Sequence, residues 1–165
     1  MAKKIIGVFG AGQITDTSEE YQLSLAVGRQ LAQKGFVVLT GGLGGTMAAA
    51  SKGAREAGGM TVGILPGNRN SSPANKYVDI AIYTGMGEAR NVINVKSCQA
   101  AIAIGGEYGT LSEIALALKG NCPVVLLRSW SLAPHGGKIC PGCEIAATAE
   151  QAVEMAVAAA AGRGS

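Results

Sequence analysis

The chain has 165 residues, of which 48% are hydrophobic and only 15% are charged. This length suits one domain, and the charged fraction lies below the roughly 25% of average globular proteins, so the composition excludes an intrinsically disordered chain. The net charge of +3 comes from scattered lysines and arginines, which provide no basic stripe for nucleic acid and mildly favour an anionic small molecule.

Short apolar runs alternate with longer segments of helical period, a pattern typical of βαβ units. Strands are predicted over residues 5–9, 36–39, 61–65, 80–83, 100–104 and 123–127. A capping box at Thr17 and Glu20 opens the first helix, which Gly35 ends. Further helices are predicted over about residues 46–57, 88–98 and 111–118, and from a capping box at Thr148, whereas residues 128–147 are expected to be irregular. We therefore expect an α/β fold, with residues 1–165 forming a single Rossmann-like, ligand-binding domain around a doubly wound, mostly parallel sheet.

A polar segment, residues 67–75, follows the third predicted strand. It is rich in turn-forming residues and lies where a ligand-covering loop lies in such folds. A plain connector is an equally good interpretation of it.

Three predicted strands run directly into glycine-rich turns. The residues concerned are Gly10, Ala11 and Gly12 after the first strand, Thr40, Gly41, Gly42, Gly44, Gly45 and Thr46 around the end of the second, and Gly105, Gly106, Glu107, Gly109 and Thr110 after the fifth. Parallel strands end at one edge of a sheet, where amides at helix N-termini favour anions. The three turns therefore predict a site for a phosphate-bearing ligand.

Two common nucleotide sites do not match these turns. The first turn is a partial G-x-G-x-x-G with Thr15 at the third glycine, and the second strand ends without the acidic residue that holds a ribose, which disfavours NAD. The sequence also lacks G-x-x-x-x-G-K-[ST], so phosphoryl transfer on a P-loop is excluded.

Residues 105–113, Gly-Gly-Glu-Tyr-Gly-Thr-Leu-Ser-Glu, resemble the G-G-x-G-T-x-x-E signature of the lysine decarboxylase-like Rossmann superfamily, which includes the Lonely Guy phosphoribohydrolases, with one additional residue after the double glycine. The double glycine at Gly41 and Gly42 and the position of Arg90 agree with this resemblance. Within the superfamily, residues 4–10 and 85–91 and the short chain are most similar to the molybdenum cofactor carriers. The resemblance extends from the first to the sixth predicted strand.

In the phosphoribohydrolases the signature glutamate and an upstream arginine help to cleave an N-glycosidic bond, so the resemblance places these roles on Glu113 and Arg90. The chain departs from that pattern at Ile104, where the family has proline, and at Asn91, where it has lysine. Glu113 has an alternative role as a first-turn acid that complements a helix N-terminus. A cation near a helix start is poorly placed for the dipole, so Arg90 is better explained by a ligand phosphate.

A carrier needs anion-binding amides, an arginine and a cleft, but no nucleophile and no protein-held metal, because the metal arrives with the cofactor. We therefore expect the chain to bind, protect and deliver molybdenum cofactor (molybdopterin) to molybdoenzymes, using the three turns together with Arg90 and Glu113. The alternative is a nucleoside 5'-monophosphate phosphoribohydrolase of the Lonely Guy type. The resemblance also implies a homo-oligomer, either a dimer or a tetramer.

The remaining motifs suggest structural roles. Cys98 and Cys122 lie beside apolar runs and are expected in the core. Cys140 and Cys143, with His135 upstream, form only half of a zinc site, so a reduced pair in a loop is expected and no metal site is assigned. Four unevenly spaced cysteines, no secretory apolar run and no run near the roughly 18 residues of a membrane span predict a cytoplasmic protein with no membrane role.

Overall fold

The computed structural model describes residues 2–133, 137 and 140–162. They build a seven-stranded sheet in the order β4-β3-β2-β1-β5-β6-β7, and every neighbouring pair of strands is parallel. The strands are β1 (Ile5–Gly10), β2 (Val37–Thr40), β3 (Thr61–Leu65), β4 (Ile80–Tyr83), β5 (Ala100–Ile104), β6 (Val124–Leu127) and β7 (Cys143–Ala146). The helices are α1 (Glu19–Gln33), α2 (Thr46–Glu56), the 3-10 turn η1 (Gly87–Arg90), α3 (Asn91–Lys96), α4 (Tyr108–Lys119) and α5 (Ala149–Ala161). The predicted doubly wound, parallel α/β fold is confirmed.

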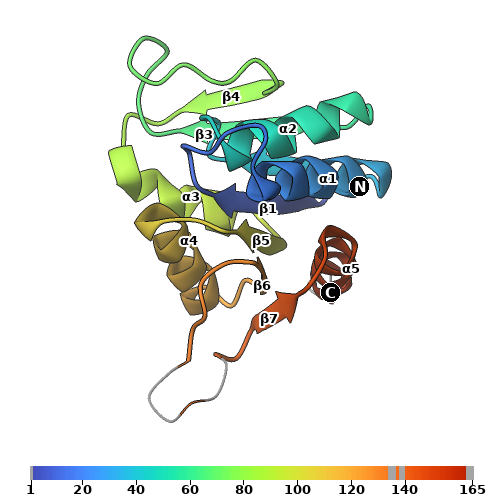
Figure 1. Cartoon of the computed structure of the whole chain (residues 1–165). Coiled ribbons are helices and arrows are strands. Elements are labelled where there is room, and N and C mark those ends of the chain that lie inside the picture. Colours follow the sequence, from blue (N-terminus) through green and yellow to red (C-terminus); the bar gives the residue numbers. More distant parts are fainter. Residues whose placement is uncertain (1, 134–136, 138–139, 163–165) are drawn as a thin grey trace.

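Helices cover both faces of the sheet, with α1, α2 and α5 on one side and α3 and α4 on the other (Figure 1). Each side has its own apolar core cluster, the first around Val27, Leu31 and Val153 and the second around Phe9, Val95 and Ile114. Strand β5 is fully buried along its whole length, because helices cover it on both faces. Because helices cover both faces of the sheet, the central strands are apolar at consecutive positions and not only at alternate ones.

Helices α1 and α2 approach each other through glycine. A Cβ added at Gly28 would lie 2.0 Å from the carbonyl oxygen of Ala50, and one added at Gly53 would lie 2.0 Å from that of Leu25. No side chain fits in these spaces, so two glycines set the distance between the helices and hence the position of the turn that precedes α2.

The beginning of α1 differs from the prediction. Ser18, and not Thr17, is the N-cap, because its Oγ accepts a hydrogen bond from the amide of Tyr21 at 3.2 Å. The Thr17 hydroxyl pairs instead with that of Thr15 at 3.2 Å. Both residues are good capping types one position apart, so their order in the sequence could not decide between them. The cap predicted at Thr148 is confirmed by the bond from the amide of Gln151 at 3.1 Å.

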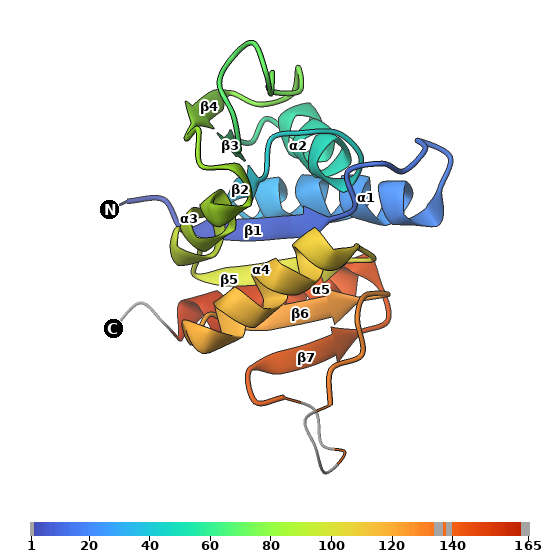
Figure 2. The same ribbon diagram turned by 90° about the vertical axis from the view of Figure 1, so that its left-hand side faces the viewer.

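The segment predicted to be irregular, residues 128–147, contains the edge strand β7. This prediction was wrong because β7 has four residues, only two of which are buried, so it lacks the continuous apolar run that marked the other strands. The helix predicted over residues 88–98 is also divided, into η1 and the short α3. In Figure 2 the arrows of β6 and β7 point the same way, as in the parallel pair they form.

Candidate functional site

A pocket of about 190 Å³ lies beyond the carboxyl ends of β1, β2 and β5. Strand β1 has β2 on one side and β5 on the other, so this is the point at which the winding of the sheet reverses and where ligands bind in open parallel sheets. The pocket is lined by Phe9, Gly10, Ala11, Gly12, Gly41, Leu43, Met47, Glu88, Arg90, Asn91, Glu107, Gly109, Thr110 and Glu113. The three glycine-rich turns therefore meet at one pocket.

Many of the residues predicted for the site line this pocket. They are Gly10, Ala11, Gly12, Gly41, Arg90, Glu107, Gly109, Thr110 and Glu113. The others, which are Thr40, Gly42, Gly44, Gly45, Thr46, Gly105 and Gly106, are not among its lining residues. Some of these shape the turns: the Thr40 hydroxyl accepts the amide of Gly42 at 3.1 Å, and the Thr46 amide donates to the carbonyl of Ala11 at 3.0 Å.

Sequence reasoning missed five lining residues, namely Phe9, Leu43, Met47, Glu88 and Asn91. Glu88 and Asn91 flank Arg90 in the segment that carried the family resemblance, so their position was a usable signal. Leu43 and Met47 are ordinary apolar residues, and nothing in the sequence distinguishes them from core residues.

Arg90 and Glu113 form a buried ion pair at the base of the pocket. Arg90 Nη1 lies 3.5 Å from Glu113 Oε1, and each side chain is 8% exposed. The amide nitrogen Nδ2 of Asn94 donates to the same Oε1 at 2.7 Å. The Arg90 Nε is buried without a hydrogen-bond partner, so the guanidinium retains a donor that the protein does not use.

Gly41 allows Arg90 to take this position. A Cβ at residue 41 would lie 2.8 Å from both terminal nitrogens of the guanidinium and 2.7 Å from the sulfur of Met47. The double glycine of the second turn therefore has a steric reason, since any side chain there would displace the cation of the pocket.

Burial shifts the pKa values of this pair in the directions that favour the neutral forms. Desolvation raises the pKa of Glu113 to about 7, although the hydrogen bond from Asn94 and the charge of Arg90 act in the opposite direction. Desolvation also lowers the pKa of Arg90 below its ordinary value, against the attraction of Glu113 and Glu88. The proposed alternative for Glu113, a first-turn acid of its helix, is wrong: α4 begins at Tyr108 and has no acidic residue in its first turn.

The N-terminus of α4 contributes backbone donors to the pocket. Glu107 is the N-cap, but no side chain accepts a hydrogen bond there, and the following Gly109 and Thr110 line the pocket. The first amides of a helix have no intrahelical acceptor and attract negative charge. The carboxylates of Glu88 and Glu107 belong to exposed residues of the lining. The site thus combines a buried cation and free amides with two exposed acids.

The polar segment between β3 and β4 forms hydrogen bonds to the second glycine turn. The Asn75 amide donates to the Gly42 carbonyl at 2.9 Å, and its side-chain Nδ2 donates to the carbonyls of Gly42 at 3.1 Å and Leu43 at 2.8 Å. None of residues 67–75 is among the residues that line the pocket. The segment supports the site without forming its wall.

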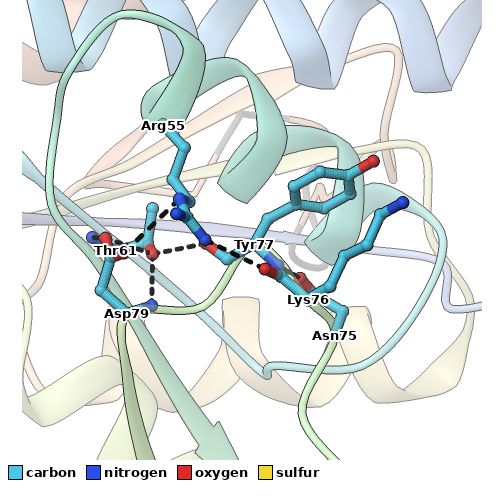
Figure 3. Close-up of polar contacts among 6 residues, drawn as sticks. All are labelled: Arg55, Thr61, Asn75, Lys76, Tyr77 and Asp79. Carbon is cyan, nitrogen blue, oxygen red and sulfur yellow. Dashed lines mark hydrogen bonds and ion pairs between the residues drawn. The ribbon is translucent and has the colours of Figure 1, made fainter.

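A network of polar contacts anchors residues 75–79, which follow this segment into β4, to α2 and β3 (Figure 3). Asp79 Oδ2 accepts hydrogen bonds from the Thr61 amide at 2.9 Å and from its hydroxyl at 3.0 Å. Arg55 donates from Nη1 to the Lys76 carbonyl at 3.0 Å and lies 3.5 Å from Asp79 Oδ1. Hydrogen bonds to the second glycine turn, α2 and β3 therefore hold the end of this connection in place.

The cysteines have structural surroundings. Cys98 and Cys122 are buried in the α3–α4 core, as predicted, and burial raises the pKa of the Cys98 thiol. Cys140 and Cys143 are free and lie at a turn that leads into β7. Within the described ranges, no three His, Cys, Asp or Glu side chains gather as a metal site, and His135 lies outside those ranges. No helix in the described part of the chain is long and apolar enough to cross a bilayer.

A parallel sheet flanked by helices, with glycine turns and a buried arginine at the winding reversal, defines a Rossmann-like α/β protein with a pocket at the carboxyl ends of its strands. Residues 3–160 match the model of the SLOG cluster4 family, and the chain belongs to this family.

Relatives match most of the chain. An uncharacterised protein of Archaeoglobus fulgidus is 50% identical over 123 residues, which are 74% of this chain and 79% of that protein. The molybdenum cofactor binding protein of the phototrophic bacterium Rippkaea orientalis is 39% identical, with a TM-score of 0.83 over 96% of this chain and 98% of that one. The molybdenum cofactor carrier protein of Chlamydomonas reinhardtii is 40% identical, with a TM-score of 0.83 over 97% and 99%.

Proposed function

We propose that this protein binds molybdenum cofactor in the pocket, protects it and delivers it to molybdoenzymes without catalysing a reaction on it. The observation that carries the proposal is the buried guanidinium of Arg90, whose Nε has no partner, in a pocket whose lining includes Gly10, Gly12, Gly41 and Gly109. A buried cation with an unused donor is satisfied by an anion. The two relatives named for binding or carrying molybdenum cofactor support the identity of that anion.

The residues of the pocket fit one end of such a ligand. Molybdenum cofactor is a pyranopterin with a phosphate and a dithiolene-bound oxo-metal, and Arg90 with the first amides of α4 would hold the phosphate. The volume of about 190 Å³ is below the roughly 300 Å³ at the lower end of small-molecule sites, so the pterin would remain at the mouth. There Glu88 and Glu107 can accept hydrogen bonds from ring and amino N–H groups.

Binding is tested with the purified protein and intact cofactor, measured as a saturable titration with adenosine monophosphate as a competitor. We expect Arg90→Gln to weaken binding about 10- to 100-fold, the loss of one charge-assisted contact. Arg29→Gln, which removes an exposed ion pair with Glu56 away from the pocket, is the matched control and should bind normally. Binding of the unmutated protein no higher than background would contradict the proposal.

Delivery needs a separate measurement. The loaded protein is mixed with a cofactor-free molybdoenzyme, and recovered activity is compared with that produced by free cofactor at the same concentration under air. A carrier should give more activity, because the bound cofactor is sheltered from oxidation. Equal recovery from both sources would count against a protective role.

Phosphoribohydrolase activity is the second candidate, and one observation favours it. Glu113, with a pKa of about 7 beside Arg90, can exchange a proton near neutral pH and, when ionised, stabilise a developing oxocarbenium ion. The test is release of the base from several nucleoside monophosphates. Turnover that Glu113→Ala abolishes while binding persists would establish the enzyme, and no turnover by the unmutated protein would favour the carrier.

A further inference from the structure

The pocket holds one buried cation, and the protein already pairs it with a buried carboxylate. Arg90 of η1 and Glu113 of α4 are both buried, and both line the pocket. Within the described part of the chain, Glu113 has no ion-pair partner other than Arg90, and Arg90 has none other than Glu113. When both side chains are ionised the pair is neutral as a whole, so it leaves no positive charge for an anionic ligand.

The other groups around Glu113 are negative or neutral. Glu88 of η1 and Glu107 at the N-cap of α4 line the same pocket, and the charge of Glu88 repels an ionised Glu113. Strands β1, β5 and β6, on which α4 packs, contain no titratable side chain. From α3, Cys98 is a neutral thiol, since burial raises its pKa well above the ordinary value. An anion that enters this pocket therefore meets one cation and three carboxylates.

A proton on Glu113 would change its carboxyl group from a competitor of the ligand into a donor. Asn94 Nδ2 donates to Oε1 at 2.7 Å, so Oε1 can act as the carbonyl oxygen while Oε2 carries the proton, and that hydrogen bond is kept. The protonated carboxyl can then donate to an anion in the pocket that Glu113 lines. Arg90 keeps its full charge for the same anion, and its Nε is a donor that the protein does not use.

We propose that the pocket binds its anion together with one proton, which adds to Oε2 of Glu113. Here, as in the proposed function, an anion is the ligand of Arg90, and the inference rests on that function to this extent. The ligand class is a doubly charged oxyanion, such as a phosphate monoester, for which repulsion by an ionised Glu113 is strongest. Burial raises the pKa of Glu113 to about 7, so the proton is available near neutral pH. The affinity for the anion should therefore fall as the pH rises above 7.

The test is isothermal titration calorimetry of the full chain with sulfate, repeated at each pH in two buffers of different ionisation enthalpy. Sulfate stays doubly charged between pH 6 and pH 8, whereas a phosphate monoester itself takes up a proton near pH 6. At pH 8 the unmutated protein should take up about one proton per sulfate and bind it about tenfold more weakly than at pH 6. Sulfate binding without proton uptake at pH 8, or no sulfate binding at either pH, would overturn the inference.

Glu113→Gln is the decisive variant, because its amide keeps an acceptor for Asn94 but cannot take up a proton. It should bind sulfate equally well at pH 6 and pH 8, with no proton uptake. Glu88→Gln and His135→Asn are the controls, since Glu88 is a second carboxylate of the pocket and His135 is the only histidine of the chain. Each should still take up about one proton per bound sulfate. Uptake that is lost in a control and kept in Glu113→Gln would assign the proton to another group.

A second measurement uses the unmutated protein and so remains valid if Glu113→Gln does not fold. Infrared difference spectra with and without sulfate at pH 8 should show a gain in the carbonyl band of a protonated carboxyl group, which a protonated histidine or amine does not produce. No gain at saturating sulfate would refute proton uptake by Glu113 and leave the carrier proposal standing. Failure of the intact cofactor to bind would instead refute the carrier proposal and leave the sulfate result unaffected.

Discussion

Arg90 and Glu113 share a buried position in which neither charge is fully compensated. The 3.5 Å separation between Nη1 and Oε1 is long for an ion pair, and the Arg90 Nε has no partner. Burying charges is costly unless every donor and acceptor is used. The pair therefore costs stability in the free protein, and an anion on Arg90 would recover part of that cost.

The stability of the protein should depend on pH through Glu113. Its pKa is raised from 4.5 to about 7 in the folded state, so the folded chain binds this proton more tightly than the unfolded chain. The stabilisation is fully present below pH 4.5 and is lost as the pH rises through 7, a change of about 3 kcal/mol. Urea unfolding at pH 4.5 and pH 8 should show this loss in the unmutated protein and its absence in Glu113→Gln. The same pH dependence in both proteins would show that Glu113 is not responsible.

Gly109 has no steric reason to be glycine within the protein. It lies in the first turn of α4, and a Cβ there would meet no atom within 4 Å. Gly109→Ala should therefore raise the unfolding free energy by about 0.5–1 kcal/mol, because alanine favours the helix.

The same substitution should weaken ligand binding by about tenfold if the phosphate lies against this turn, because the new methyl group would project where the ligand approaches. Gly162→Ala at the end of α5 is the control, since its nearest neighbour would be 3.7 Å away and its φ is −67°. Binding is measured by titration and stability by urea unfolding. Unchanged affinity in Gly109→Ala would place the ligand elsewhere in the pocket.

At the residue scale, the sequence indicated Arg90 and Glu113 as members of one site but not their partner Asn94. Asn94 bonds to Glu113 because α3 and α4 lie side by side, and this depends on packing that no local pattern encodes. Four of the nine glycines predicted for the site line the pocket, namely Gly10, Gly12, Gly41 and Gly109, because they follow strands that end at this edge of the sheet.

At the scale of a single element, the N-cap hydrogen bond of Ser18 stabilises the first turn of helix α1. Ser18→Ala should lower the unfolding free energy by about 1 kcal/mol, because it removes the acceptor for the Tyr21 amide. Thr17→Ala is the matched control and should change it by less than about 0.5 kcal/mol. Both values come from urea unfolding. A larger loss for Thr17→Ala would restore the capping box that the sequence suggested.

Elements with a continuous apolar run or a clear helical period were predictable, and those without were not. Strands β1 to β6 were all recognised from their apolar runs. In β2, β5 and β6 the runs reflect burial of every residue, whereas β4 was recognised although none of its residues is buried. Strand β7 was missed because its buried and exposed residues mix, with Glu144 and Ile145 both exposed. The division of residues 88–98 into η1 and α3 at Arg90 and Asn91 was not predicted.

At the scale of the whole molecule, the order of strands fixes where stability is greatest. Strands β1 and β5 are central and pair on both sides, whereas β4 and β7 pair on one side only. Amides of β1 and β5 should exchange with solvent only on global unfolding, and those of β4 through local opening. Hydrogen exchange measured at low protein concentration checks this order. Faster exchange in β5 than in β4 would contradict it.

The parallel topology was predictable from the alternation of strands and helices, because only crossovers can join parallel neighbours. The order of the strands could not be predicted, because each later strand can join either edge of the sheet that begins with β1. The meeting of three turns at one pocket followed from parallelism alone. The supporting role of Asn75 could not be foreseen, because it joins residues more than thirty positions apart.

The central place of β1 has a consequence for synthesis on the ribosome. Its neighbour β5 ends at Ile104, so the first strand to be made waits for well over half of the polypeptide before its second edge is paired. During that interval the nascent chain presents an open apolar edge that invites pairing with other chains. Translation speed and chaperone supply in the host should therefore influence the yield of folded protein.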